Sequence, residues 1–489
     1  MAKDLDRIFN PASIAMVGAS NTPAKWGSFL LINLMAGGYP RERIYPVNPR
    51  ETTIHGLQAY PSLASLPTVP DLAFITTPAT TVAGILEECA RVGTDHIIVI
   101  SSNFSEVGED GARLEREVKE TAIRHGLTVV GPNTMGIVST RRRIFAVGAP
   151  VQLHPGGISF VSQSGNVGAN MLGWTMNQGI GFGKFVGSGN EALLHAEDYI
   201  DYFGEDDETS LILAYLEGVD NGRDFIEIVS RISLAKPVIV LKSGRTEEGG
   251  RAAMSHTGSL AGSDHIYDAA FRQSGAIRAD TSQDMLDLAK AFERLPLPRG
   301  DRVGVITLGG GWGVLATDAT AAAGLKMGRL DAEVTRVCDE MLPPFWSHAN
   351  PVDLVGTIYM DTHVAILEAM AKSPEMDAII VLGSLGTGTI IGLNVLVSQK
   401  LIMDMSEDAL KGFFTELKGR NIRLLARAKE LMATYNKPIV FVEMQFIGEE
   451  SLRDLEAGET VIFTAPEKAA AIIAKMLQYR RYLERKGAI

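Results

Sequence analysis

Short apolar runs of strand length alternate with amphipathic helical segments along the chain. Helical patterns at residues 80–92 and 111–125 separate some of the early runs. The early runs are Ser13–Val17, Ile44–Val47, Leu72–Thr76, His96–Ile100 and Thr128–Val130. Strands that alternate with helices are typical of βαβ units, in which parallel strands share one sheet and helices cover its faces. The pattern therefore predicts a doubly wound α/β domain over residues 1–145.

The same alternation starts again at Gly157 and a third time at Val303. The second series has strand candidates at Ile158–Val161, Gly183–Val186, Leu211–Leu216 and Val238–Lys242. The stretch LPLPRGDR that follows this series combines proline, glycine and charge, as a linker does. We expect an α/β protein with three Rossmann-like or flavodoxin-like doubly wound parallel-sheet domains, at residues 1–145, 146–297 and 298–489.

Composition narrows the class of protein. Hydrophobic residues make up 46% of the 489 residues, which is ordinary for a globular protein. The net charge of -12 argues against nucleic acid, because there is no basic excess to neutralise phosphates. Two cysteines exclude a disulfide framework. No apolar run approaches the roughly 20 residues of a membrane span, and no signal peptide is evident. We expect a cytoplasmic protein without membrane contact.

Each predicted domain opens with a strand, a few small residues and a helix start. Helix N-termini attract anions, so such turns are candidate phosphate sites. In the first domain the turn reads VGASNTPAKWG, which is not a GxGxxG motif. The second strand ends in Val47-Asn48-Pro49 without the acid that holds the ribose of NAD. A ribose that carries phosphate, as in CoA or NADP, fits better. The third strand ends at Thr77 and Pro78, although Pro78 could equally just start a helix.

The second domain opens with Ser162-Gln163-Ser164-Gly165. Two serines and a glycine at a helix start suit an ordinary helix cap. They suit a cradle for phosphate, or for a phosphorylated side chain, equally well. The residues alone leave both interpretations open.

His256 stands in the loop Ser243–Asp264, which is rich in Gly, Ser and Ala. Loops of this length are uncommon unless they are functional or disordered. Neutral imidazole is a good nucleophile near physiological pH, so a phosphorylated His256 could carry phosphate between sites. Glu217 follows the strand Leu211–Leu216 and could fix the tautomer of the ring. The alternatives are an inert exposed histidine and a solvated glutamate at a strand end.

Taken together, these motifs resemble a known family, the α subunits of the NDP-forming (ADP-forming) acyl-CoA or acetyl-CoA synthetases of the succinyl-CoA synthetase superfamily. The matching segments run in family order over nearly the whole chain. They are VGAS with Lys25, YPVNP, ITTPA, GPNTMG, FVSQSGNVG, SGN at 188–190, YLEGV, SHTGSLAGSD, ITLGGGWGVLATD and NPVDL.

The resemblance implies an acid–thiol ligase with the reaction acyl-CoA + NDP + phosphate ⇌ carboxylic acid + CoA + NTP, through acyl phosphate and phosphohistidine. It implies that His256 and Glu217 are catalytic. It implies phosphate binding by Ser162, Gln163, Ser164 and Gly165. The residues it implies for coenzyme A are Gly18, Ser20, Lys25, Val47, Asn48, Thr77, Pro78 and Asn133. No metal ligand on this chain is implied.

The family's nucleotide site lies in an ATP-grasp domain, which we do not find here. The resemblance therefore implies a separate ATP-grasp β subunit that binds ADP or ATP and Mg²⁺, in an αβ or α₂β₂ assembly. The chain departs from the family at Thr134, where cysteine is common, at Asn103, where glycine is usual, and at Trp312, where a small residue is usual. Asparagine tolerates left-handed backbone angles, so that turn can survive.

Two other functions compete with this one. A non-catalytic CoA-binding regulatory subunit would bind CoA without moving phosphate, but His256 stands in its full motif. An NADP-linked oxidoreductase is disfavoured because no GxGxxG turn is present. The sequence leaves open which acid is used, whether the nucleotide is ADP or GDP, and the physiological direction.

Overall fold

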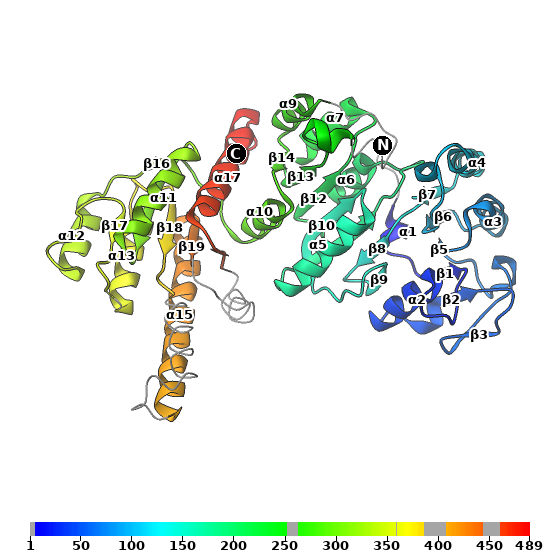
Figure 1. The fold of residues 1–489 in the computed structure, drawn as a ribbon, viewed down its shortest axis with the longest axis horizontal. Coiled ribbons are helices and arrows are strands. Elements are labelled where there is room, and N and C mark those ends of the chain that lie inside the picture. Colours follow the sequence, from blue (N-terminus) through cyan, green and yellow to red (C-terminus); the bar gives the residue numbers. More distant parts are fainter. Residues whose placement is uncertain (1–4, 252–262, 358, 386–406, 444–459) are drawn as a thin grey trace. The chain divides into compact units, whose positions relative to one another are not determined.

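The computed structural model describes residues 5–251, 263–357, 359–385, 407–443 and 460–489 (Figure 1). The chain forms two compact units, Met1–Ala289 and Lys290–Ile489. Each unit is described by itself. Across the described residues, no helix combines the length and the apolar character that crossing a membrane requires.

The first sheet of the N-terminal unit has the strand order β2-β1-β5-β6-β7, and all its strands are parallel. Its strands are β1 (Ile14–Val17), β2 (Ile44–Val47), β5 (Leu72–Ile75), β6 (His96–Val99) and β7 (Thr128–Val130). Its helices are α1 (Asp6–Phe9), α2 (Trp26–Ala36), α3 (Ala79–Val92) and α4 (Glu109–His125). The small hairpin is formed by β3 (Thr53–Ile54) and β4 (Leu57–Gln58).

Strand β1 shows why these strands are apolar throughout. Its side chains alternate between the two faces of the sheet. Ile14 and Met16 belong to one core cluster, whereas Ala15 and Val17 belong to another. Both faces are covered, as parallel sheets require, so no polar position is left along the strand. Burying each large apolar side chain stabilises the fold by about 1.5–3 kcal/mol.

The second sheet has the order β14-β13-β12-β10-β11-β8-β9. Strands β10 to β14 are parallel, whereas β8 is antiparallel to both β11 and β9. The strands are β8 (Gly136–Ser139), β9 (Ile144–Val147), β10 (Pro155–Ser162), β11 (Phe182–Gly187), β12 (Leu211–Leu216), β13 (Val238–Lys242) and β14 (Ile277–Ala279). The helices are α5 (Gly165–Asn177), α6 (Ala196–Glu205), α7 (Gly222–Ile232), α9 (Asp264–Ser274) and α10 (Ser282–Arg294).

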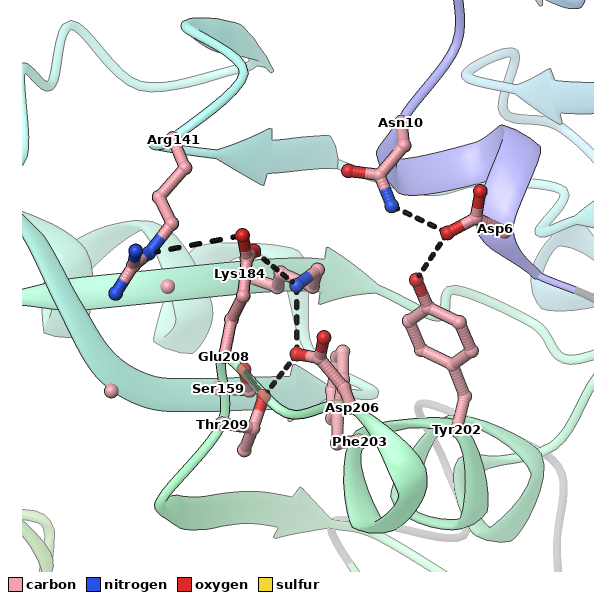
Figure 2. A network of polar contacts seen from close by, with 12 residues as sticks. Asp6, Asn10, Arg141, Ser159, Lys184, Tyr202, Phe203, Asp206, Glu208 and Thr209 are labelled. Carbon is pink, nitrogen blue, oxygen red and sulfur yellow. Dashed lines mark hydrogen bonds and ion pairs between the residues drawn. The ribbon is translucent and has the colours of Figure 1, made fainter.

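A buried lysine holds the amino-terminal edge of this sheet (Figure 2). Lys184 on β11 is 1% exposed, and its Nζ lies 2.7 Å from Asp206 Oδ2 and 2.9 Å from Glu208 Oε2. Thr209 donates to Asp206 and lies 2.7 Å from Ser159 on β10. The charge of the buried lysine is therefore compensated by two carboxylates. The network connects β10, β11 and the segment that precedes β12.

The C-terminal unit contains a sheet of order β16-β15-β18-β19-β20, with β17 beside β15. Its strands, all parallel, are β15 (Arg302–Thr307), β16 (Lys326–Met327), β17 (Val352–Asp353), β18 (Ala378–Leu382), β19 (Ile439–Val442) and β20 (Ile462–Phe463). Its helices are α11 (Gly310–Ala322), α12 (Ala332–Met341), α13 (Met360–Lys372), α15 (Glu407–Tyr435) and α17 (Pro466–Lys486).

The predicted fold class is confirmed. In chain order, the five main parallel strands of each sheet lie in the spatial order 2-1-3-4-5, which is the flavodoxin-like doubly wound arrangement. The division into domains at 145 and 297 stays a prediction. Strand β8 pairs with β11 and β9 pairs with β8, so residues 136–147 extend the second sheet.

Candidate functional site

The strand order places a crevice at the carboxyl ends of β1 and β5, where the chain switches from one side of β1 to the other. The backbone is packed tightly there. Gly18 has φ 87°, and a Cβ on it would lie 2.7 Å from Thr76 Oγ1. A Cβ on Gly27 would lie 2.3 Å from the carbonyl oxygen of Gly18. Glycine is therefore required at both positions, and α2 can begin directly against the turn.

Several predicted CoA residues build this turn. The Asn48 side chain donates to the carbonyl of Ala19 at 2.8 Å, and Gly18 N donates to the carbonyl of Val47 at 3.1 Å. The Val47 side chain is buried in the core. Ser20 Oγ accepts from Thr22 N at 3.1 Å. Lys25 is exposed at the N-cap of α2.

A cavity of about 710 Å³ lies where the carboxyl ends of both sheets of the N-terminal unit meet. The first sheet contributes the segments after β5, β6 and β7, and the second contributes those after β10, β11 and β12. The lining residues are Trp26, Thr76, Thr77, Pro78, Ile100, Ser101, Ser102, Asn103, Ser105, Glu106, Glu115, Asn133, Thr134, Met135, Gln163, Ser164, Gly165, Asn166, Gly189, Asn190, Glu191, Glu217, Gly218 and Asp220.

The N-terminus of α5 opens into this cavity. Ser164 is the N-cap, and its Oγ accepts from Val167 N at 3.5 Å. Ser162 is fully buried and donates to the carbonyl of Ser164 at 2.7 Å, so its side chain shapes the turn. The first N–H groups of a helix lack intrahelical partners and carry a partial positive charge. This end of α5 can therefore receive an anion beside Gly165.

The Gln163 side chain connects three strand ends. Its Nε2 donates to Glu191 Oε2 at 2.9 Å and to the carbonyl of Gly218 at 3.1 Å. Its Oε1 accepts from Glu217 N at 2.5 Å and from Gly218 N at 3.1 Å. These four hydrogen bonds occupy both donors and both acceptor sites of the carboxamide. Gln163 therefore fixes the backbone that carries Glu217, and its side chain has little left with which to bind phosphate.

Glu191 is a residue of the cavity that our sequence analysis missed. It follows the SGN segment, and its φ of 57° is left-handed, which costs a non-glycine residue about 1–3 kcal/mol. Its Oε1 accepts from Ser188 Oγ at 2.6 Å. Burial raises the pKa of Glu191 to about 8. The signal available in the sequence was a glutamate in the short segment after a strand, at the carboxyl edge of the sheet.

Asn190 links the two sheets across the cavity. Its Nδ2 donates to Glu106 Oε2 at 2.8 Å and to Glu115 Oε2 at 2.7 Å. Its Oδ1 accepts from Asn133 Nδ2 at 3.2 Å. Asn103 has φ 72°, so asparagine does adopt the left-handed turn that the sequence suggested. Thr134 is buried and donates to the carbonyl of Gly187.

The cavity is acidic. Five carboxylates line it, namely Glu106, Glu115, Glu191, Glu217 and Asp220, and its described lining contains no lysine, arginine or histidine. Within the described ranges, no group of three or more His, Cys, Asp or Glu is placed to hold a metal ion. An anionic substrate here thus relies on helix N-termini, or on cations from elsewhere.

His256 lies outside the described residues. The strand that leads to its loop is described, and Ser243 N donates to the carbonyl of Leu216 at 3.0 Å. The loop therefore leaves the sheet beside Glu217.

The cavity brings together seven of the predicted site residues. Thr77, Pro78, Asn133, Gln163, Ser164, Gly165 and Glu217 line it. Pro78 is also the N-cap of α3, so it does stand at a helix start, and its contact with a ligand stays a prediction. Gly18, Ser20, Lys25, Val47, Asn48 and Ser162 are not among the lining residues and stand around the adjoining turns.

Three family descriptions match the chain in succession. Residues 12–140 match a CoA binding domain. Residues 155–292 match a succinyl-CoA ligase like flavodoxin domain. Residues 303–412 match a Ligase-CoA domain.

Named relatives agree with these matches. The chain is 42% identical to the α subunit of acetate–CoA ligase [ADP-forming] I from Pyrococcus furiosus, over 77% of this chain and 82% of that one. It is 35% identical to 4-hydroxybutyrate–CoA ligase [ADP-forming] from Nitrosopumilus maritimus, over 88% of this chain and 61% of that one. The structure of dinucleotide forming acetyl-coenzyme A synthetase 1 from Ca. Korarchaeum cryptofilum, in complex with phosphate and ADP, superposes with a TM-score of 0.85 and 34% identity, covering 99% of both chains.

Proposed function

The chain belongs to the family of ADP-forming acetate–CoA ligase α subunits, and from that premise we propose that it is the α subunit of an NDP-forming acyl-CoA synthetase. One observation carries the proposal. A single cavity joins the edge of the CoA-binding domain, at Thr77 and Asn133, to the start of α5 and to Glu217. A thioester carbonyl and an inorganic phosphate can thus meet in one place.

The proposed reaction has three steps. Phosphate attacks the thioester carbonyl carbon, the C–S bond breaks, and CoA leaves as a thiolate. The His256 imidazole then attacks phosphorus in the acyl phosphate, and the carboxylic acid leaves with the bridging oxygen. Finally an oxygen of the nucleoside diphosphate takes the phosphoryl group and regenerates His256.

The residues of this chain take defined parts in this proposal. The N-terminus of α5 at Ser164 and Gly165 stabilises the phosphoryl oxygens. Glu217 accepts a hydrogen bond from His256 and so fixes the tautomer that presents the other nitrogen to phosphorus. Thr77, Pro78 and Asn133 meet the thiol end of CoA, whereas Gly18, Ser20, Lys25, Val47 and Asn48 form the turn that holds its nucleotide end.

We also propose a partner. The relatives from Pyrococcus furiosus are named α subunits, which implies another subunit. The acidic lining of the cavity gives a physical reason, because acidic side chains cannot neutralise a phosphate. An ATP-grasp β subunit that brings the nucleoside diphosphate and Mg²⁺ would supply the missing positive charge.

The test is labelling of the full chain with radioactive inorganic phosphate in the presence of acetyl-CoA. We expect acid-labile, base-stable label on the wild type and none on His256→Ala. His125→Ala is the matched control, because His125 is exposed in the last turn of α4 and should keep the label. CoA binding without label on the wild type would favour a regulatory subunit instead.

A further inference from the structure

Glu191 lies in the wall of the cavity with 11% of its side chain exposed and without a strong cation beside it. In the described part of the chain, no lysine or arginine pairs with its carboxyl group. The imidazole of His195, with Nδ1 3.8 Å from Glu191 Oε2, is the basic side chain in reach. The other titratable groups around Glu191 are Glu197 and Tyr199 on α6 and, at the end of β12, Glu217 and Asp220.

The hydrogen bonds of Glu191 accommodate a proton. Ser188 Oγ lies 2.6 Å from Glu191 Oε1 and 3.4 Å from the carbonyl oxygen of Ser162. A hydroxyl can donate and accept at once. A protonated Glu191 can therefore donate from Oε1 to Ser188, while Ser188 donates onward to Ser162. Its Oε2 still accepts from Gln163.

The same carboxyl group also orients Gln163. An acceptor at Glu191 Oε2 keeps the Gln163 NH₂ on its side, so the carboxamide oxygen faces Glu217 N and Gly218 N. The contacts thus form one chain from Glu191 through Gln163 to the backbone of Glu217.

We propose that Glu191 is a positioning residue of the reaction, an uncharged carboxylic acid that orients Gln163, and through it Glu217, without adding negative charge to the cavity. The inference rests on the proposed function. Four other carboxylates already line the cavity, and a further negative charge in its wall would repel the phosphate and the acyl phosphate. Burial supports the uncharged form, since it raises the pKa of Glu191 to about 8.

The first experiment compares phosphate labelling by wild type, Glu191→Gln and Glu191→Ala from pH 6.5 to 9.5. Wild-type labelling should fall above pH 8, by about tenfold per pH unit once the charged form dominates. Glu191→Gln should keep most of the activity at pH 7 and lack that fall. Glu191→Ala should label about 10-fold to 100-fold less at pH 7 with unchanged CoA affinity, because Gln163 loses its acceptor. Glu205→Gln, exposed at the end of α6, is the control.

An alkaline fall that persists unchanged in Glu191→Gln overturns the proposal. So does loss of labelling in Glu191→Gln as severe as in Glu191→Ala, because the carboxylate would then act as an anion. Equal labelling by all three proteins also overturns it.

A second experiment does not depend on catalysis. Thermal unfolding of wild type and Glu191→Gln is followed between pH 4 and pH 9. The raised pKa means that the unfolded state loses this proton first, so the wild type should lose stability relative to Glu191→Gln as the pH rises from about 4.5 to 8. A flat difference overturns the proposal. If the wild type takes no label at all, the proposed function fails, and this series still decides whether Glu191 is uncharged.

Discussion

The two edges of the second sheet differ in how their ionisable side chains are paired. At the amino-terminal edge, Lys184 is 1% exposed and meets two carboxylates within 3 Å (Figure 2). At the carboxyl edge, seven residues further along the chain, Glu191 is 11% exposed and lies among hydrogen-bond donors and other acids. The first edge is typical of an ion-pair network that stabilises the fold, because its charges compensate one another. The second keeps a titratable group poised near neutral pH, as functional sites do.

The pKa of Asp206 at the first edge is lowered, whereas the pKa of Glu191 at the second edge is raised. Burial raises the pKa of Asp206, but the hydrogen bonds from Lys184 and Thr209 outweigh it and leave the pKa below its ordinary value. Burial also raises the pKa of Glu191, and the hydrogen bonds from Ser188 and Gln163 do not overcome it. Neutral donors lower a carboxyl pKa less than a buried ammonium does.

The largest effect is expected at the paired edge. Lys184→Met leaves two carboxylates without their cation, which should destabilise the N-terminal unit by about 3–5 kcal/mol. Urea unfolding of the full chain measures this loss. Arg231→Met breaks exposed ion pairs of α7 and should cost less than about 1 kcal/mol. Equal losses of stability in the two variants would mean that the buried ion pairs of Lys184 contribute no more to stability than exposed ones.

A smaller effect is expected at the carboxyl edge. Gln163→Leu removes the partner of Glu217 N and of Glu191, so phosphate labelling should fall about 10-fold to 100-fold. The affinity for CoA should not change, because the turn after β1 is untouched. Gln152→Leu, exposed in the connection before β10, is the matched control for the labelling assay. Equal losses of labelling and of CoA affinity would point to a general folding defect.

The smallest effect is a difference in pH dependence. Asp206→Asn should lower stability by about 1 kcal/mol at neutral pH, where the wild-type carboxylate is ionised. Because the folded pKa is lowered, this advantage of the wild type is present above about pH 3.8 and disappears as the pH falls through the folded pKa. Thermal unfolding between pH 2.5 and pH 7 measures the gap. For Glu191→Gln, the difference in stability from the wild type should change at higher pH and with the opposite sign. If the stability differences of the two variants changed with pH in the same way, the two carboxyl groups would not differ as we expect.

The sequence by itself determined the sheets. Fully apolar strands such as Ile14–Val17 have to be buried on both faces, and the polar positions between them follow the period of helices. These are local constraints with a short period, so they can be read from neighbouring residues. The motifs also located the strand ends that line the cavity, at Thr77, Asn133 and Glu217.

Only the tertiary structure decided what each polar side chain does at those ends. Gln163 and Ser162 were expected to bind phosphate, yet their side chains are engaged with the neighbouring strand ends. Lys184 and Glu191 lie seven residues apart on one segment. The neighbouring sequence does not predict that Lys184 is ion-paired whereas Glu191 is uncharged. Lys184 pairs with Asp206 and Glu208, and Glu191 accepts from Gln163. Contacts between residues so far apart in the sequence depend on which strands become neighbours in the sheet.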